Sequence, residues 1–432
     1  MKILEIFNSK QIRTAAIGSL TIKFLSAFFA LINGILLANL LSVKEFGIYI
    51  LAFTTITVIS IPVSLGLPHL ITRYISKYEV TKNLSAMKGL LIRSNQFVLL
   101  SSLLTALIAL ILYAVWWKNY PNNVVETFWY AFILLPLLVF GSLRAATLRG
   151  LKYVILGQMP DTFLRNLFFS LTLLWVTFFG REITPQGAML YHGIAAAIAF
   201  FIGYLFLKQK LLNQLRKIKP IFLNRLWLRE AIPFSVISGV QVIKSKFLTY
   251  VLAGFAGIEA VAIFDVAQRG AALVSFTADA LNMAISPYIS SAYEQKQRDT
   301  LQRIVKKTAR IIFVFSIPMA FLFIILGKPI IGFLFGNEYE LSYIPLVIIC
   351  VGHIVNAISG PLLAVLNMTG NQRYLSKNQI QMMFLSVIIS FPFIHFFDVI
   401  GAALVFSFVF IIQNLILVFF IKRKLNINTT IF

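Results

Sequence analysis

Seven charged residues lie deep inside long apolar stretches of this sequence, where a charge is costly. A charged side chain at the centre of a membrane span costs about 3 kcal/mol on insertion scales, so each one marks a candidate functional position. An excess of fixed cations around a water-filled cavity favours an anionic passenger. The five cations are Lys23, Arg165, Lys244, Lys246 and Arg269, and the two acids are Asp265 and Asp279.

A phosphate or pyrophosphate group is the natural ligand for such a set, because Arg and Lys bind phosphate oxygens with strong, charge-assisted hydrogen bonds. A pump for cationic drugs would need the opposite sign. Asp265 and Arg269 are four residues apart and share a helix face, so a purely structural ion pair is an equal alternative. Lys244 and Lys246 are two apart and point in different directions, so we expect one to face the cavity. Asp265 and Asp279 are the candidates for coupling to an ion gradient.

Uncharged polar residues within the same stretches allow two interpretations: they could line a sugar-binding cavity, or they could bond helix to helix. The four histidines are scattered without ligand spacing, so no metal site is expected. Neither a P-loop nor a hydrolase motif is present, so no cofactor is expected, and transport would draw on a proton, sodium or substrate gradient. The polar residues are Asn33, Asn39, Gln241, Gln268, Asn282 and Asn356.

The elements that position these residues are apolar runs long enough to cross a bilayer. Hydrophobic residues make up 59% of the 432 residues, charged residues only 12%, and the mean hydropathy is +0.87. A span needs about 20 apolar residues, and inside lipid it must be helical to satisfy its backbone. The sequence therefore predicts an all-α integral membrane protein with about twelve transmembrane helices. The expected spans are 14–41, 47–70, 89–115, 124–147, 156–180, 185–207, 231–255, 260–286, 308–327, 341–366, 378–397 and 400–421.

The net charge of +23 is explained by membrane orientation and by anionic lipid headgroups, and no nucleic-acid motif accompanies it. Lys and Arg concentrate in alternate connections, which places those connections and both termini in the cytoplasm. The first span shows no convincing cleavage site and is expected to remain. The connections rich in Lys and Arg contain Arg73, Lys77, Lys82, Lys88, Arg144, Arg149, Lys152, Lys208 to Arg229, Lys296 to Arg310, Arg373, Lys377 and Lys422 to Lys424. The connections on the opposite side, the sparse side, contain only Lys44, Lys118, Arg181 and Lys328.

The chain is expected to form two pseudo-symmetric six-helix lobes, residues 1–207 and 231–432. The basic, Leu- and Trp-containing stretch 208–230 between them predicts a cytoplasmic linker with an amphipathic helix on the membrane surface, and a specific headgroup site is the alternative. YISKYE at 74–79 and YISSAYE at 288–294 each follow the second span of a half. Two halves in the same orientation indicate a parallel repeat with a pathway at its interface.

Three stretches carry a family resemblance: ILLANLLSVKEFGIYILAF at 35–53, AVAIFDVAQRGAAL at 260–273 and GKPIIGFLFGNEY at 327–339. They resemble stretches of the polysaccharide-transport flippases of the multidrug/oligosaccharidyl-lipid/polysaccharide (MOP) exporter superfamily. ILLANLLSVKEFGIYILAF at 35–53 is similar to the family's leucine-rich turn, acidic loop and aromatic-Gly-x-Tyr, with Ser42-Val43 in place of Gly-Pro. AVAIFDVAQRGAAL at 260–273 and GKPIIGFLFGNEY at 327–339 are similar to two further family stretches. The family's acidic-basic pair in the seventh span appears here as Ser245-Lys246, which puts ion coupling at that position in doubt.

The resemblance implies a MOP or MATE-like fold and a flippase, not an enzyme. Such a protein moves an undecaprenyl-diphosphate-linked oligosaccharide across the bacterial inner membrane by alternating access, for O-antigen, capsule or exopolysaccharide synthesis. It implies a polysaccharide polymerase and chain-length proteins as partners. A cation-coupled multidrug antiporter of the same fold is the alternative, and a membrane sugar polymerase is a weaker one.

Overall fold

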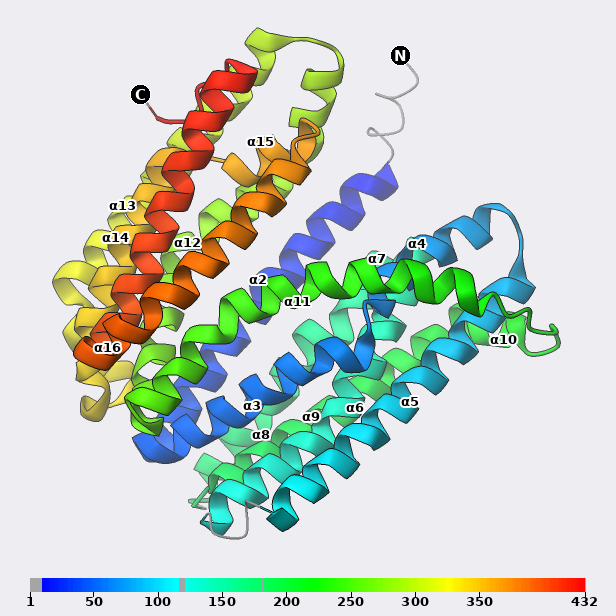
Figure 1. The fold of residues 1–432 in the computed structure, drawn as a ribbon, viewed down its shortest axis with the longest axis horizontal. Helices are drawn as coiled ribbons and strands as arrows, with labels where there is room; N and C mark the ends of the chain where they lie inside the picture. Colours follow the sequence, from blue (N-terminus) through cyan, green and yellow to red (C-terminus); the bar gives the residue numbers. More distant parts are fainter. Residues whose placement is uncertain (1–9, 116–120, 181, 432) are drawn as a thin grey trace. The chain divides into compact units, whose positions relative to one another are not determined.

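The computed structural model describes residues 10–115, 121–180 and 182–431, and all regular structure in these ranges is helical, as expected (Figure 1). Lys118 and Arg181, two of the cations assigned to the sparse side, lie outside the described residues. In chain order the elements are α2 (Lys10–Leu40), α3 (Val43–Ser64), α4 (Leu67–Val80), α5 (Leu84–Val115), α6 (Asn122–Gly150), α7 (Val154–Gln158), the π-helical η2 (Met159–Leu164), α8 (Arg165–Phe178), α9 (Pro185–Leu207), the π-helical η3 (Lys208–Leu212), α10 (Asn213–Leu215), α11 (Asn224–Phe255), α12 (Ile258–Glu294), α13 (Arg298–Phe335), the 3-10 helix η4 (Asn337–Ser342), α14 (Tyr343–Ser359), α15 (Leu362–Met368) and α16 (Gln372–Leu425).

The number of membrane spans agrees with the expectation once two irregular helices are taken into account. In the described ranges, 10 helices are long and apolar enough to cross a bilayer. The fifth expected span, 156–180, lies in the helical run α7–η2–α8, which a π-helical turn interrupts. The last two expected spans both lie in α16, which is 54 residues long.

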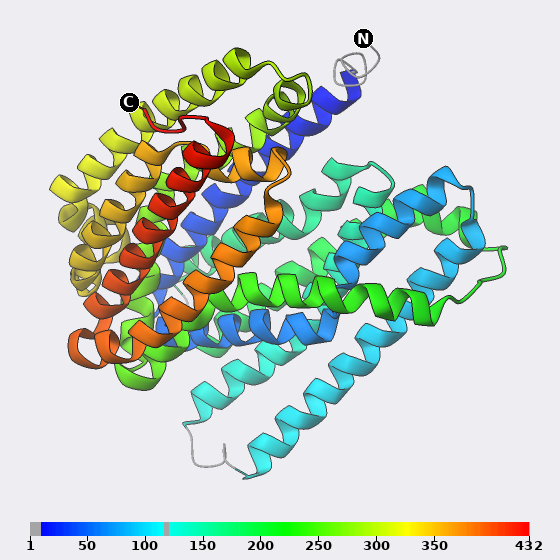
Figure 2. The ribbon, with the colours of Figure 1, turned by 45° about the horizontal axis from the view of Figure 1, so that its top comes forward.

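Helix α16 is a hairpin of two antiparallel helices that meet at Asp398. Asp398 has non-helical backbone angles (φ 47°, ψ −125°), and it falls between the expected spans 378–397 and 400–421. Tyr374 and Phe420, near opposite ends of α16, stack with ring centroids 3.5 Å apart. Figures 1 and 2 both show the two halves side by side. The turn between the two halves is therefore made by one residue with a strained backbone, Asp398, and it separates two complete spans.

The chain folds as two compact units, Met1–Lys246 and Phe247–Phe432. The boundary lies within α11 and not in the 208–230 segment. The lobes expected from the sequence, 1–207 and 231–432, stay a prediction. The N-terminal part of α11 belongs to the first unit, where Arg73 of α4 forms a 2.9 Å ion pair with Glu230. Burial and a hydrogen bond to Glu230 raise the pKa of Tyr74, on the same helix, to about 12.

The 208–230 segment is helical only in part, and its placement on the membrane surface stays a prediction. Helical structure continues from α9 to Leu215, an irregular stretch follows, and α11 begins at Asn224. The Lys88 ammonium of α5 donates to the Ile218 carbonyl at 2.8 Å, and the Ile221 amide donates to a carbonyl at the start of α5 at 3.0 Å. Because hydrogen bonds attach its backbone to α5, this segment is held in place within the first unit. We call it the strap.

The helix α3–α4 is broken at Leu65 and Gly66, which both have left-handed backbone angles (φ 44° and 67°). The backbone of α11 approaches this break closely. A Cβ added at Gly66 would lie 2.6 Å from the Ala231 carbonyl oxygen and would also clash with the Ser235 amide nitrogen. Both the backbone angles and the contact therefore require glycine.

The two copies of the tyrosine-containing repeat have diverged in their surroundings. Ile75 and Ile289, at matching positions, are both fully buried. Tyr74 is buried in the first unit, whereas Tyr288 is 66% exposed in the second. The isoleucine therefore packs into a core in both copies. The first tyrosine of the repeat is buried only in the first copy, which lies beside α11.

Gly66→Ala is expected to lower the midpoint of thermal unfolding in detergent. The left-handed backbone and the contact with α11 together cost on the order of 2–4 kcal/mol. Gly193→Ala is the matched control, because nothing lies within 4 Å of its added Cβ. An unchanged midpoint for Gly66→Ala would show that the break between α3 and α4 does not depend on this residue.

Candidate functional site

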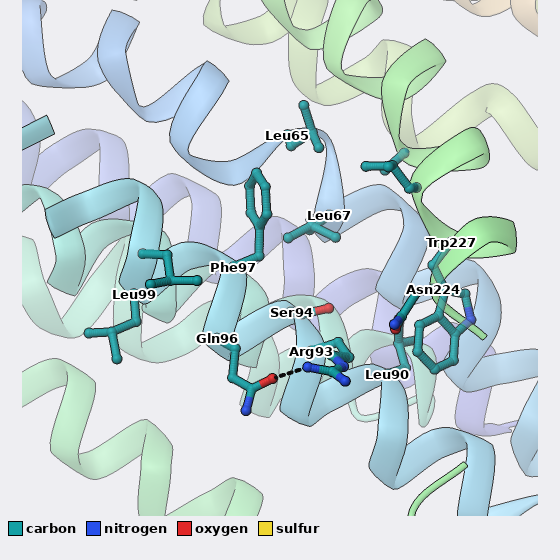
Figure 3. A pocket seen from close by; sticks show the side chains of 13 residues that line it. Leu65, Leu67, Leu90, Arg93, Ser94, Gln96, Phe97, Leu99, Asn224 and Trp227 are labelled. Carbon is teal, nitrogen blue, oxygen red and sulfur yellow. Dashed lines mark hydrogen bonds between the residues drawn. The ribbon is translucent and has the colours of Figure 1, made fainter. Parts of the chain in front are cut away.

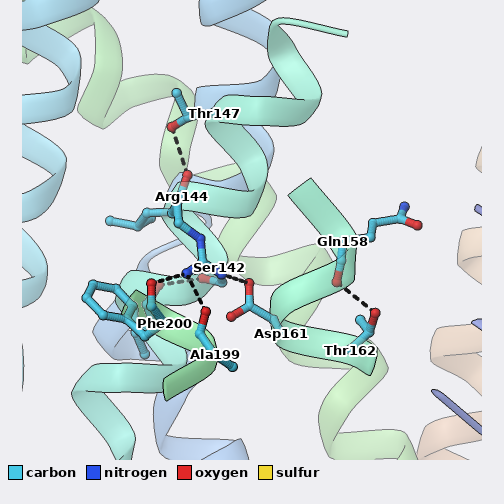
Figure 4. Close-up of polar contacts among 10 residues, drawn as sticks. Ser142, Arg144, Thr147, Gln158, Asp161, Thr162, Ala199 and Phe200 are labelled. Atoms are coloured by element: carbon cyan, nitrogen blue, oxygen red, sulfur yellow. Dashed lines mark hydrogen bonds and ion pairs between the residues drawn. The ribbon is translucent and has the colours of Figure 1, made fainter. Parts of the chain in front are cut away.

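An ion pair between Arg144 of α6 and Asp161 of η2 lies in the first unit (Figure 4). Arg144 Nη2 is 2.5 Å from Asp161 Oδ2, and the Arg144 side chain is only 4% exposed. Its Nη1 donates to the Phe200 carbonyl at 2.8 Å, and its guanidinium lies 5.5 Å from the Phe200 ring centroid. One side chain of α6 thereby holds η2 and α9.

Local sequence makes room for this pair. Asp161 follows Pro160 in the π-helical turn η2, and such turns are frequent at functional sites. A Cβ at Gly141 of α6 would lie 2.6 Å from Asp161 Oδ1. A Cβ at Gly203 of α9 would clash with the Arg144 guanidinium. Two glycines therefore create the space in which the charged groups meet.

The sequence assigned Arg144 to the cation-rich connections on the cytoplasmic side, and that assignment stays a prediction. Helix α6 continues to Gly150, and Arg144 is buried within it. Asp161 was missed among the buried acids, although its position inside the expected span 156–180 pointed to it. The sequence showed neither the burial of Arg144 nor its contact with Asp161, because a window of apolar residues marks where a span lies but not which of its ends packs against other helices.

Arg165 lies one helical turn after Asp161, at the start of α8. Its Nε is buried and has no hydrogen-bond partner among the described residues. His192 of α9, which packs in the same unit, is hydrogen-bonded to the Tyr49 hydroxyl at 2.7 Å. His192 also stacks on Phe169, with ring centroids 4.6 Å apart. Arg165 Nε is therefore a buried donor near the Arg144–Asp161 pair that no acceptor among the described residues satisfies.

A polar ladder joins α2 to the α7–η2–α8 run. Its residues on α2 are seven apart, at Ser19, Ser26 and Asn33, and those on the partner run are four apart. Both spacings keep polar groups on one helix face. Asn33 thus bonds helix to helix, the second of its two interpretations. The bonds are Ser19 Oγ to Gln158 Oε1 (2.7 Å), Ser26 Oγ to the Thr162 carbonyl (2.9 Å), Asn33 Nδ2 to the Asn166 carbonyl (3.1 Å) and Ser170 Oγ to Asn33 Oδ1 (2.6 Å).

The second unit contains the ion pair that sequence spacing suggested. Arg269 and Asp265 pair along α12, and their side chains are 26% and 18% exposed. Asp279, further along α12, is exposed. Arg269 therefore already has a carboxylate partner within its own helix.

The other predicted cations lie in the first unit but are not part of the Arg144–Asp161 contacts. Lys23 is exposed on α2, and Lys244 and Lys246 are half-buried on α11. Among the described residues, no three His, Cys, Asp or Glu side chains are grouped so that they could hold a metal ion. The sequence-predicted set is thus divided between the units, four cations in the first and Arg269 in the second.

The motif at 35–53 has a clear structural role at the turn from α2 to α3. Ser42 caps α3: its hydroxyl accepts from the Glu45 amide, and Glu45 accepts from the Ser42 amide at 3.1 Å. This reciprocal capping box replaces the family's Gly-Pro. Phe46 is fully buried directly after it, which fixes the start of α3.

Asp161→Asn is expected to destabilise the protein by about 3 kcal/mol, because it leaves the buried Arg144 charge without its partner. The double variant Arg144→Met/Asp161→Leu should lose less than the single one, and Glu294→Gln at an exposed position should change little. Thermal unfolding in detergent measures all three. A double variant that loses as much stability as Asp161→Asn, or more, would contradict the coupling.

Comparison with known proteins agrees with the fold. The family model "Polysaccharide biosynthesis protein" matches residues 14–293, and the model "MatE" matches residues 233–395. No curated protein matched the sequence. An inward-facing multidrug resistance MATE family transporter of the MOP superfamily is similar over 95% of this chain and 98% of its own, with 14% identity and a TM-score of 0.76. A structure of the MATE multidrug transporter DinF-BH covers 97% and 96%, with 13% identity and a TM-score of 0.64.

A third solved structure, a mutant of the Vibrio cholerae MATE transporter VcmN, covers 96% of this chain and 98% of its own, with 17% identity and a TM-score of 0.57. At such identities the likeness establishes the fold alone. The first family model covers more than half of the sequence and therefore establishes the family. The chain belongs to the polysaccharide biosynthesis protein family, and it is a multi-pass membrane protein whose fold resembles that of MATE transporters.

Proposed function

We propose that this protein is a flippase for an undecaprenyl-diphosphate-linked oligosaccharide. It would act in the bacterial inner membrane by alternating access, with both termini in the cytoplasm, and serve O-antigen, capsule or exopolysaccharide synthesis. The family match over residues 14–293 supports a role in polysaccharide synthesis. The charges of the first unit support an anionic passenger.

The observation that carries this proposal is the Arg165 guanidinium. Its buried Nε has no partner among the described residues, while the nearby Asp161 is already neutralised by Arg144. A buried donor without an acceptor costs about 1–3 kcal/mol, and a phosphate oxygen would recover that energy. Arg165 is therefore the proposed first contact of the diphosphate.

The remaining predicted residues enter the proposal with the same roles. Lys23, Lys244, Lys246 and Arg269 are proposed to bind the anionic substrate. Asp265 and Asp279 are proposed to couple transport to a proton or sodium gradient, and no cofactor is invoked. A polysaccharide polymerase and chain-length proteins are the proposed partners downstream.

A cation-coupled multidrug antiporter is the second candidate, and the MatE match at 233–395 favours it. Such an antiporter needs a carboxylate available to a cation. Asp161 and Asp265 are each paired with an arginine, so a cationic drug would have to displace a guanidinium to bind either one. This pairing, together with the longer match to the polysaccharide biosynthesis family, favours the flippase.

Reconstitution into proteoliposomes separates the two candidates. A polyprenyl-diphosphate oligosaccharide is placed in both leaflets, and a membrane-impermeant glycosidase reports how much of it becomes accessible outside. The same vesicles are then tested for uptake of a cationic dye under a proton gradient. Flipping without dye uptake is expected, and dye uptake without flipping would establish the antiporter instead.

Arg165→Ala and Lys244→Ala are each expected to slow flipping roughly 10- to 100-fold, the loss that corresponds to one charge-assisted hydrogen bond. Arg165→Lys should retain part of the rate because it keeps the charge. Arg298→Ala, an exposed cation at the start of α13, is the matched control. Normal flipping in both alanine variants, at normal protein levels, would rule out phosphate binding by these cations.

A further inference from the structure

The first unit contains a pocket of about 610 Å³ between α5, the α3–α4 break and the start of α11 (Figure 3). Its volume lies within the roughly 300–1,000 Å³ of typical ligand sites. Most of its wall is apolar and comes from α5 and the break, with Trp227 of α11 on the opposite side. The apolar lining includes Leu65, Leu67, Leu90, Phe97, Leu99 and Trp227.

Two polar groups in this lining have capacity for an anionic ligand. Arg93 donates to Gln96 Oε1 at 2.9 Å and lies 4.4 Å from the Phe222 ring centroid, yet no ion pair among the described residues includes it. The neighbouring Ser94 is only 2% exposed, and its hydroxyl has no hydrogen-bond partner among those residues. A buried hydroxyl beside an arginine without a carboxylate partner indicates an absent acceptor.

Beyond the polar end, the wall continues as an apolar stripe on the outside of α5. Leu99 and Leu100 line the pocket and are 51% and 67% exposed, and Leu103 and Leu104 extend the exposed stripe. From Arg93 to Leu104 the helix rises about 16 Å, roughly half of the ~30 Å hydrocarbon thickness of a bilayer. That depth corresponds to one acyl chain in one leaflet.

We propose that this pocket binds one anionic phospholipid. Its phosphate contacts Arg93 and the Ser94 hydroxyl, and one acyl chain runs past Leu99 and Leu100. An anionic headgroup is favoured because the neighbouring strap is rich in Lys and Arg, and basic clusters at a membrane surface attract anionic lipid. The bound lipid bridges α5 and α11 within the first unit. This site is separate from the proposed passenger contact at Arg165.

Trp227 lines the pocket and serves as a reporter of the bound lipid. The protein contains five tryptophans, and replacing the other four by Phe leaves Trp227 as the only one. This variant is reconstituted in phosphatidylcholine with rising fractions of brominated phosphatidylglycerol, which quenches nearby indole fluorescence. Half-maximal quenching is expected at a fraction roughly tenfold lower than with brominated phosphatidylcholine, the ratio for about one charge-assisted contact.

Arg93→Gln should raise the half-quenching fraction of the brominated phosphatidylglycerol about tenfold, and Ser94→Ala should raise it by about threefold. Arg225→Gln is the control, because Arg225 is exposed near the pocket but does not line it. Thermal unfolding verifies that each variant is folded, and Ser94→Ala decides the question if Arg93→Gln is not.

Three results would overturn the proposal. The first is equal quenching by the two brominated lipids, and the second is unchanged quenching in Ser94→Ala and Arg93→Gln. The third is relief of quenching by unlabelled undecaprenyl phosphate at lower fractions than by unlabelled phosphatidylglycerol, which would make a polyprenyl lipid the occupant. None of these outcomes affects the flipping assay, so failure here and failure of the proposed function are distinguishable.

Discussion

The neutralisation of charge inside lipid is the constraint on which the polar architecture of this protein depends. Arg144 satisfies it by pairing with Asp161 and by donating to a carbonyl of α9, so one guanidinium joins three helical elements. Arg269 satisfies it within α12 through Asp265. Since a buried charge that loses its partner is strongly destabilising, these pairs fix the helices around them. Arg165 differs from these two arginines in that none of the ion pairs among the described residues includes it.

Glycines and small polar residues make these contacts sterically possible. Gly141 and Gly203 leave room for the Arg144–Asp161 pair, and Gly66 lets α11 reach the break between α3 and α4. The α2 ladder adds hydrogen bonds at heptad spacing, because apolar contact between helices in lipid gains little from the hydrophobic effect. Close backbone approach and satisfied polar groups therefore act together with the buried apolar side chains in packing the first unit.

Apolar runs were sufficient to predict the all-α class and the spans, including the two that meet at Asp398, because the bilayer sets span length independently of tertiary contacts. The same information could not locate Arg144, because its burial depends on α9 packing over the C-terminal end of α6. Nor could it show that the strap after Leu215 is held by Lys88. Spacing did predict the Asp265–Arg269 pair, since that contact lies within one helix.

The sign of the passenger's charge is the central claim, and native mass spectrometry of the protein purified from its own membrane tests it most directly. The account predicts a co-purified polyprenyl-diphosphate glycolipid whose occupancy falls in the Arg165→Ala variant and stays unchanged in Arg298→Ala. A protein that retains no such lipid, and that instead binds a cationic compound in competition with protons, would contradict it.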